Sequence, residues 1–192
     1  SGYTWTNIAA TGPSPRSQHV AVWDTSSSAI WIHGGLKDCV LNQELWKFDT
    51  QAGTWTSWPS SPKQPSARAN HVAVWDDANR AIWIHAGYNR ACGDLRGGLE
   101  RDLWRFDTTA SSNNWIFVGE GGPTARAYHV AGWDPTNEAI WIHGGLDGAN
   151  FCRDLWRFDT KTYEWHLLSD QEGPSARFSH AAAFDVTRVS LC

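Results

Sequence analysis

Short apolar runs separated by turn-forming residues recur along the chain in a fixed order. The segment Ala-Ile-Trp-Ile-His-(Gly/Ala)-Gly occurs at residues 29–35, 81–87 and 139–145. Each copy follows a His-Val-Ala-(Val/Gly)-Trp-Asp segment and precedes a Leu-Trp-(Lys/Arg)-Phe-Asp-Thr segment. The runs are too short for helices and are rich in Val, Ile, Trp and Phe, which predicts β-strands. The chain is therefore a repeat array with a period of about 50 residues.

Each repeat is predicted to contain four strands, denoted a to d. In the first repeat they lie near residues 18–23, 29–34, 44–49 and 53–58. Short turns rich in Asp, Ser, Asn and Gly join them, so consecutive strands should pair antiparallel. In strand b, Ile30 and Ile32 point to one face while Trp31 and His33 point to the other, and neither face is polar. Because both faces must be covered, the sheets are expected to stack on one another, as in a propeller.

The unit resembles a kelch repeat. Paired glycines close strand b, an aromatic-Asp pair ends strand c, and strand d carries Trp55, Trp115 or Trp165, although Ala86 replaces one glycine. The resemblance implies an all-β, kelch-type β-propeller with four-stranded antiparallel blades, either incomplete at about 3.5 blades or part of a larger ring. It implies less about function, because kelch propellers include binding scaffolds, ubiquitin-ligase adaptors and, in the galactose oxidase family, copper enzymes.

Residues 1–192 are predicted to form a single propeller segment. It comprises a lone d strand at 1–10, blades at 13–60, 65–119 and 123–170, and a partial blade at 174–192. The chain contains no Met, so it is expected to be a processed product or a piece of a longer protein. We favour part of a larger propeller, because an unclosed ring exposes blade faces and strand edges. The alternative is a small ring in which the N-terminal strand completes the last blade.

Composition narrows the function classes. Sixteen Lys and Arg against twenty Asp and Glu give a net charge of −4, which lacks the basic excess of nucleic-acid-binding proteins. No run approaches the roughly 20 apolar residues of a membrane-spanning helix. The sequence also lacks a CxxC pair, an HExxH motif, a phosphate-binding glycine loop and the Tyr and Cys pattern of the copper oxidases. A non-catalytic protein without cofactor or metal is expected, and its compartment stays open.

One arginine precedes strand a in every repeat, namely Arg16, Arg68, Arg126 and Arg177. Strand a is nearest the axis in this family, so these residues should form a partial ring near the central opening. Because a guanidinium pairs a carboxylate or sulfate-like group with two hydrogen bonds, the ring would bind an acidic peptide. The competing interpretation is that each arginine ties its own blade to a neighbour, and its presence in every repeat favours this second role.

Other copied residues are interpreted as framework. The histidines of strands a and b recur by position, whereas a metal site needs unlike positions to converge on one ion. Most tryptophans should fill the wedge between blades. Trp58 has no Trp counterpart in the next two repeats and lies near a proline-rich loop, so it is kept as a candidate contact residue.

The cysteines leave two alternatives open. Cys39, Cys92 and Cys152 all fall in b–c loops. Equivalent positions of adjacent blades are usually farther apart than the roughly 7 Å that a disulfide spans, so free thiols are expected. A disulfide between neighbouring loops is the alternative, and the state of Cys192 is left open.

Residues that are not copied are better guides to function, because only the fold needs the same residue in every blade. The b–c loops differ most between repeats and should share a face with the d–a connections that carry the arginines. Aromatic and Arg side chains are enriched at binding hot spots. The predicted partner-binding residues are Arg16, Arg68, Arg126, Arg177, Lys37, Tyr88, Arg90, Arg96, Phe151 and Arg153.

Our hypothesis is a non-catalytic scaffold, or an accessory subunit of a larger assembly, that docks a protein partner on this face through an acidic segment of the partner. The alternative is a segment of a kelch-type oxidase or carbohydrate-binding protein whose site lies outside these residues.

Overall fold

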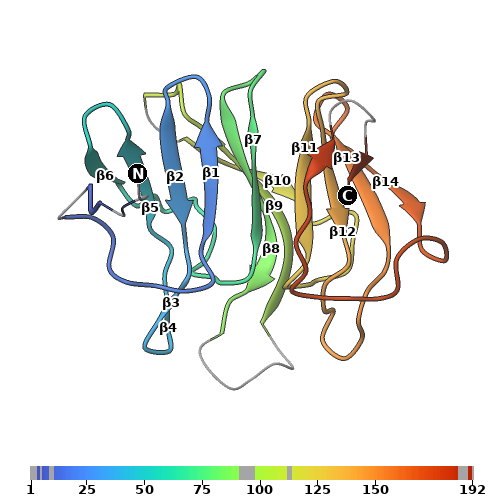
Figure 1. The fold of residues 1–192 in the computed structure, drawn as a ribbon. Helices are drawn as coiled ribbons and strands as arrows, with labels where there is room; N and C mark the ends of the chain where they lie inside the picture. Colours follow the sequence, from blue (N-terminus) through green and yellow to red (C-terminus); the bar gives the residue numbers. More distant parts are fainter. Residues whose placement is uncertain are drawn as a thin grey trace.

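The computed structural model describes residues 4, 6–8, 11–90, 98–111, 114–185 and 190–191. The secondary structure of these residues consists of β-strands, without a helix, and twelve of the strands form three four-stranded antiparallel sheets (Figure 1). Blade 1 contains β1 (Val20–Asp24), β2 (Ala29–His33), β5 (Leu45–Asp49) and β6 (Thr54–Trp58). Blade 2 contains β7 (Val72–Asp76), β8 (Ala81–Tyr88), β9 (Leu99–Asp107) and β10 (Trp115–Gly119). Blade 3 contains β11 (Val130–Asp134), β12 (Ala139–His143), β13 (Leu155–Asp159) and β14 (Glu164–Ser169).

Two further hairpins complete the described strands. β3 (Leu36–Lys37) pairs with β4 (Val40–Leu41) inside the first b–c loop, which the sequence did not suggest. β15 (Phe184–Asp185) pairs with β16 (Ser190–Leu191) after blade 3, where strand a and the start of strand b of a partial blade were expected. Of the segment 1–10, where a lone strand is expected, the structure describes Thr4 and residues 6–8, and these lie in no strand.

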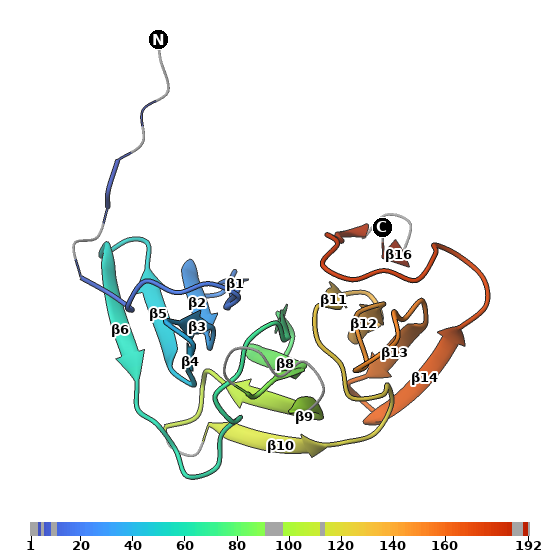
Figure 2. The ribbon, with the colours of Figure 1, turned by 90° about the horizontal axis from the view of Figure 1, so that it is seen from below.

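The three blades lie side by side along an arc. Figure 2 shows β1, β7 and β11 at its inner side and β6, β10 and β14 at its outer side. The strand order within each blade follows the chain, so each blade is a meander from the inside to the outside. The described blades therefore form an open arc of a β-propeller with four-stranded antiparallel blades, as the resemblance implies.

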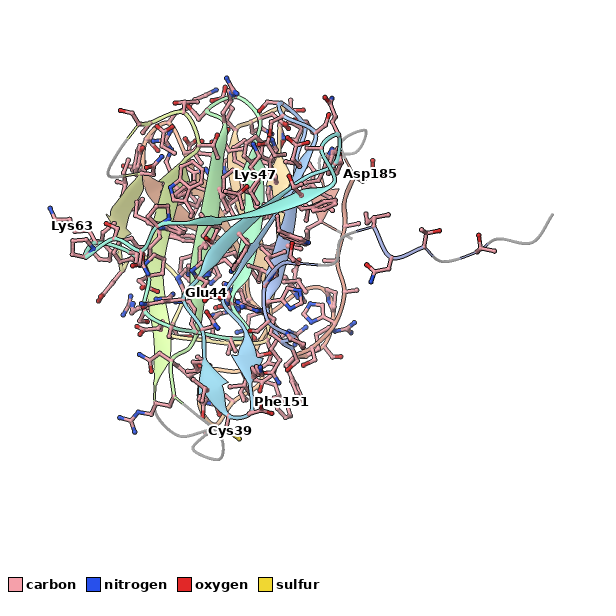
Figure 3. The ribbon with its side chains drawn as sticks, turned by 90° about the vertical axis from the view of Figure 1, so that its left-hand side faces the viewer. Cys39, Glu44, Lys47, Lys63, Phe151 and Asp185 are labelled. Carbon is pink, nitrogen blue, oxygen red and sulfur yellow. The ribbon has the colours of Figure 1, made fainter. Side chains whose placement is uncertain are left out.

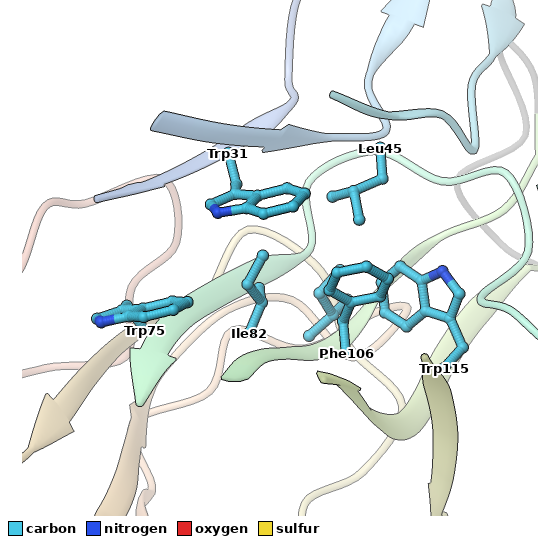
Figure 4. Close-up of a cluster of buried hydrophobic side chains, with 7 residues drawn as sticks. Trp31, Leu45, Trp75, Ile82, Phe106 and Trp115 are labelled. Atoms are coloured by element: carbon cyan, nitrogen blue, oxygen red, sulfur yellow. The ribbon is translucent and has the colours of Figure 1, made fainter. Parts of the chain in front are cut away.

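The core consists of two apolar clusters, each between two neighbouring blades. In the first cluster Trp31 and Leu45 of blade 1 pack against Ile82, Phe106 and Trp115 of blade 2 (Figure 4). The second cluster repeats this arrangement between blades 2 and 3. Strand b thus turns its tryptophan to the next blade and its isoleucines to the preceding one, as its period-two pattern requires. Burial of each such side chain stabilises the stack by about 1.5–3 kcal/mol.

The aspartate that ends strand a explains why the a–b turns are alike. Asp24 is 1% exposed, and its carboxylate accepts hydrogen bonds from Ser26 N and Ser27 N in the turn and from Trp31 Nε1 in strand b. The same carboxylate–indole bond recurs from Trp83 to Asp76. These tryptophans are therefore engaged at both the ring and the nitrogen, which confirms their framework role. The described part of the chain has no helix with the length and apolar character needed to cross a membrane.

Candidate functional site

The b–c loops and the d–a connections meet on one side of the arc, the lower side in Figure 1. Isolated antiparallel bridges join them: Ser17 with Leu36, Ala69 with Tyr88, and Ala127 with Leu146. We name this side the loop face and define it by the described residues of 11–19, 36–44, 59–71, 88–100, 120–129, 146–154 and 170–180. Its existence agrees with the antiparallel geometry expected from the sequence.

Three of the four copied arginines of the loop face, Arg16, Arg68 and Arg126, have buried side chains that bond to neighbouring parts of the fold. The Arg68 side chain is 1% exposed, and its two Nη atoms donate to the two carboxylate oxygens of Asp102 at 2.7 Å. Arg68 Nη1 also donates to Ala86 O, and Arg68 Nε donates to Ser66 O. Trp104 Nε1 donates to the same carboxylate of Asp102. Each guanidinium edge therefore has a partner within blade 2.

Blades 1 and 3 copy this network. Arg126 forms the bidentate pair with Asp154. Burial alone would raise the pKa of Asp154, but the hydrogen bonds and charge of Arg126, together with the bond from Trp156, hold it below its ordinary value. Arg16 pairs with Glu44 through one nitrogen at 2.6 Å, and this carboxylate is half exposed, with 50% of its side-chain surface accessible. The first pair is thus more solvated than the other two.

The backbone of the arginines links neighbouring blades. Gly35 N at the end of strand b in blade 1 donates to Arg68 O of blade 2 at 2.8 Å, and Gly87 N donates to Arg126 O at 2.9 Å. These contacts support the tying role and do not support the predicted acid-binding role of Arg16, Arg68 and Arg126, because the three guanidinium groups are buried and already bonded. Arg177 keeps the same backbone link, since Gly145 N donates to Arg177 O at 2.9 Å, but its side chain is exposed and the side-chain bonds described for it go to Ser175.

Pairs of histidines also join the blades. Nδ1 of His33 in strand b lies 3.1 Å from Nε2 of His71 in strand a of the next blade, and the same distance separates His85 from His129. A third pair joins His143 to His180. Burial lowers the pKa of His33 and of His85 to about 3, so both rings are neutral and one nitrogen of each pair donates while the other accepts. The histidines act as framework, and the described residues hold no group of three or more His, Cys, Asp or Glu arranged for a metal ion.

The remaining predicted residues differ in accessibility. Lys37 and Arg90 are exposed, whereas Tyr88 is 8% exposed and belongs to the interior. Arg153 is partly buried and lines, together with Arg177, a cavity of about 400 Å³ between blade 3 and the segment that follows it. Arg96 lies outside the described residues.

An exposed aromatic cluster is the feature of the loop face that copied positions do not explain. Phe151 is 57% exposed and Phe178 is 44% exposed, and their rings stack with centroids 5.0 Å apart and planes at 17°. Tyr128 meets Phe178 edge-on at 6.0 Å. Sequence analysis identified Phe151 but missed the other two. A comparison of the d–a connections would have identified both as uncopied aromatic residues. Ser17 and Ala69 occupy the position of Phe178, and Gln18 and Asn70 occupy the position of Tyr128.

The cluster borders the propeller axis. Tyr128 belongs to an axial row, defined as Gln18, Asn70, Tyr128 and Ser179, in which the backbone N–H of each member after Gln18 donates to the carbonyl of the preceding member. All four residues have positive φ, between 52° and 60°, a conformation that is uncommon outside glycine. The row and the strand a histidines line a cavity of about 220 Å³. The backbone of the row is uniform, while its side chains differ from blade to blade.

The cysteines are not all free thiols. Cys39 is in a disulfide, so the expectation of a free thiol is wrong for this residue. Cys152 is free, and burial raises the pKa of its thiol to about 11. Cys92 and Cys192 lie outside the described residues.

The meander blades, their copied inter-blade bonds and the accessible loop face define a β-propeller protein. A sequence profile described as the KLHDC2/KLHL20/DRC7 Kelch-repeats domain matches residues 1–191. The chain belongs to the kelch-repeat family.

Two relatives with similar repeats are much longer proteins than this chain. The chain is 29% identical to the Leucine-zipper-like transcriptional regulator 1 homolog of Drosophila melanogaster, with 92% of this chain and 19% of that protein covered. It is 23% identical to the Dynein alpha chain, flagellar outer arm, of Chlamydomonas reinhardtii, with 85% of this chain and 4% of that protein covered. A solved structure, "Structure of YjhT", superposes with a TM-score of 0.73 at 16% identity over 94% of this chain and 60% of the other. The chain spans a fifth or less of the length of these two relatives.

Proposed function

We propose that the chain is a non-catalytic kelch-repeat binding module, serving as a scaffold or as an accessory subunit of a larger assembly. It docks a protein partner on the loop face. The observation that carries this proposal is the stacked pair of Phe151 and Phe178, which leaves two aromatic rings in solvent at positions that the fold does not copy. Aromatic side chains in such settings are enriched among the residues that dominate binding energy.

We assign four basic residues of the loop face as contacts for an acidic segment in the partner. Lys37, Arg90, Arg153 and Arg177 all belong to the loop face. In contrast, the buried arginines are neutralised by Asp102, Asp154 and Glu44 and contribute little to a partner. The proposed contact set is therefore smaller than the sequence suggested, with Tyr128 and Phe178 added and Arg16, Arg68, Arg126 and Tyr88 removed.

The test is affinity capture from cells that express the full-length protein, with captured proteins quantified by mass spectrometry. Phe151→Ala combined with Phe178→Ala should remove specific partners, because losing hot-spot rings costs about 2 kcal/mol or more each. Phe117→Ala is the matched control, since Phe117 is 52% exposed but lies on outer strand β10. If the double variant captures the same partners as the control, the aromatic cluster is not the docking site.

The alternative of an oxidase segment is separated by metal analysis. Stoichiometric copper or iron in the purified full-length protein would contradict the scaffold proposal, whereas capture of partners through the loop face would not depend on a metal.

A further inference from the structure

Two adjoining cavities on the outer side of blades 1 and 2 form a site distinct from the loop-face aromatic cluster. Their volumes are about 410 and 360 Å³, and both are lined by Trp58, Pro59, Ser60 and Trp115. Figure 2 shows the connection after β6 passing beside the start of β10 at this place, and Figure 3 shows Lys63 of this connection projecting outward. We name the combined space the rim pocket.

The rim pocket exists because the connection between blades 1 and 2 departs from the repeat. In the neighbouring connections a glycine before a proline lies on the strand d tryptophan: a Cβ added to Gly12 would lie 2.6 Å from the Trp55 indole, and one added to Gly122 would clash with the Trp165 indole. Gln64 stands at this position before blade 2. A glutamine cannot approach Trp115 as closely as a glycine, so the connection stands away from the indole.

Trp58 supplies the second aromatic wall. Blades 2 and 3 have Val118 and Leu168 at this position, so the ring is a feature of blade 1 alone among the three. It is held in place by Trp31, with ring centroids 5.5 Å apart, and by Phe106, edge-on at 5.6 Å. A ring fixed in this way loses little side-chain entropy when a ligand packs on it.

Apart from the Glu44 carboxylate, the polar side chains described in the lining of the rim pocket are neutral. Gln43, Gln64, Ser57 and Ser60 line it, and the described lining residues include no Lys or Arg. Asn114 also lines it, but its side-chain nitrogen already donates to Asp107 O and Ala110 O. The carboxylate of Glu44 is already bonded to Arg16 and Trp46. Side-chain amides and hydroxyls both donate and accept, which suits a ligand with many hydroxyl groups, while indole rings suit the C–H face of a sugar ring. We infer that the rim pocket binds a neutral oligosaccharide.

Binding is tested by saturation-transfer NMR and calorimetry on the full-length protein with three probes: cellotetraose, maltotetraose and triacetylchitotriose. At least one should bind, and Trp58→Val should weaken its binding at least tenfold while keeping the fold, because valine occupies this position in blade 2. Gln64→Gly should also abolish binding, since glycine lets the connection close over Trp115. Lys63→Ala and Phe151→Ala are the controls that keep binding, and the second shows independence from the proposed partner site.

Three results would overturn the inference. The first is that none of the three sugars binds the unaltered protein at millimolar concentration. The second is that both the Trp58→Val and the Gln64→Gly variants bind the sugar as tightly as the unaltered protein does. The third is that decaproline, a peptide probe for the same aromatic and proline-rich walls, binds in a Trp58-dependent manner while the sugars do not.

Discussion

The buried and the exposed side chains of the loop face differ in whether they are copied from blade to blade. Below the surface, Arg68 and Arg126 are copies in identical networks, buried and fully hydrogen-bonded. At the surface, Phe151 and Phe178 have no equivalents in the other blades and keep about half of their area in solvent. Copying therefore marks what holds blades together, and departure from the copy marks what is available to a ligand. Three experiments probe the framework half of this comparison.

Acid should have the largest effect, because it acts on every histidine pair at once. His33, His71, His85 and His129 are buried, and burial lowers the pKa of each below the ordinary value of 6.5. Unfolded histidines bind protons below pH 6.5 while the folded ones do not, so stability present above that pH is lost as the pH falls toward 3. Below pH 6.5, each buried histidine lowers the free energy of unfolding by about 1.4 kcal/mol per pH unit, so complete unfolding is expected before the pH reaches 4.

Urea denaturation at pH 7.5, 6.0 and 5.0 measures this loss. Burial opposes ionisation of Asp154, but the hydrogen bonds and charge of Arg126 and the bond from Trp156 together keep its pKa below its usual range. This carboxylate therefore titrates below the pH range tested and does not affect the result. His166, which is exposed on β14, supplies the control: His166→Gln should leave the pH profile unchanged. A stability that stays constant from pH 7 to pH 5 would refute the role of the pairs.

The stability lost when an arginine loses its carboxylate partner should be larger for a buried pair than for a solvated one. Asp102→Ala leaves the Arg68 guanidinium buried without its carboxylate and is expected to cost about 3–5 kcal/mol. Glu44→Ala removes a half-exposed partner of Arg16 and is expected to cost about 1 kcal/mol or less. Thermal and chemical denaturation of the two variants measures the difference. Equal losses would mean that the copies are energetically equivalent despite their different exposure.

We expect the smallest changes in stability from substitutions at the first glycine position after strand b. Gly34 has φ +70°, and an added Cβ would lie 2.7 Å from Arg68 O, so Gly34→Ala should cost about 1–3 kcal/mol. Ala86 adopts the same left-handed conformation at φ 59° with its Cβ present. Ala86→Gly should therefore stabilise the protein by up to about 1 kcal/mol, read as a higher urea midpoint. A loss of stability on this substitution would show that the methyl group contributes more packing than strain.

The blades were predictable from the sequence because their signals are local and repeated. Period-two alternation around Trp31 and its copies gave the strands, and the turn residues gave the meander order. The framework role of the histidines also followed from repetition. In contrast, the pairing of His33 with His71 joins strands of different blades, and no local pattern carries that information.

The functional surface was harder to predict for a physical reason. A repeat shows where a side chain stands along the chain but not how much of it water reaches. Arg68 and Phe151 both belong to the loop face, yet one is bonded on every edge and the other is exposed. Likewise, the effect of Gln64 appears only when the glycine contacts of Trp55 and Trp165 are compared with it.

The bond from Gly35 N to Arg68 O also bears on how the protein acquires its structure. The carbonyl that closes strand b of one blade belongs to the arginine of the next, so a single blade lacks an acceptor for its own glycine. The smallest cooperative unit is consequently a pair of blades, and stability accumulates through nearest-neighbour coupling rather than blade by blade. Hydrogen exchange at Gly35 N should therefore report the opening of the junction between blades 1 and 2, not the opening of blade 1 alone.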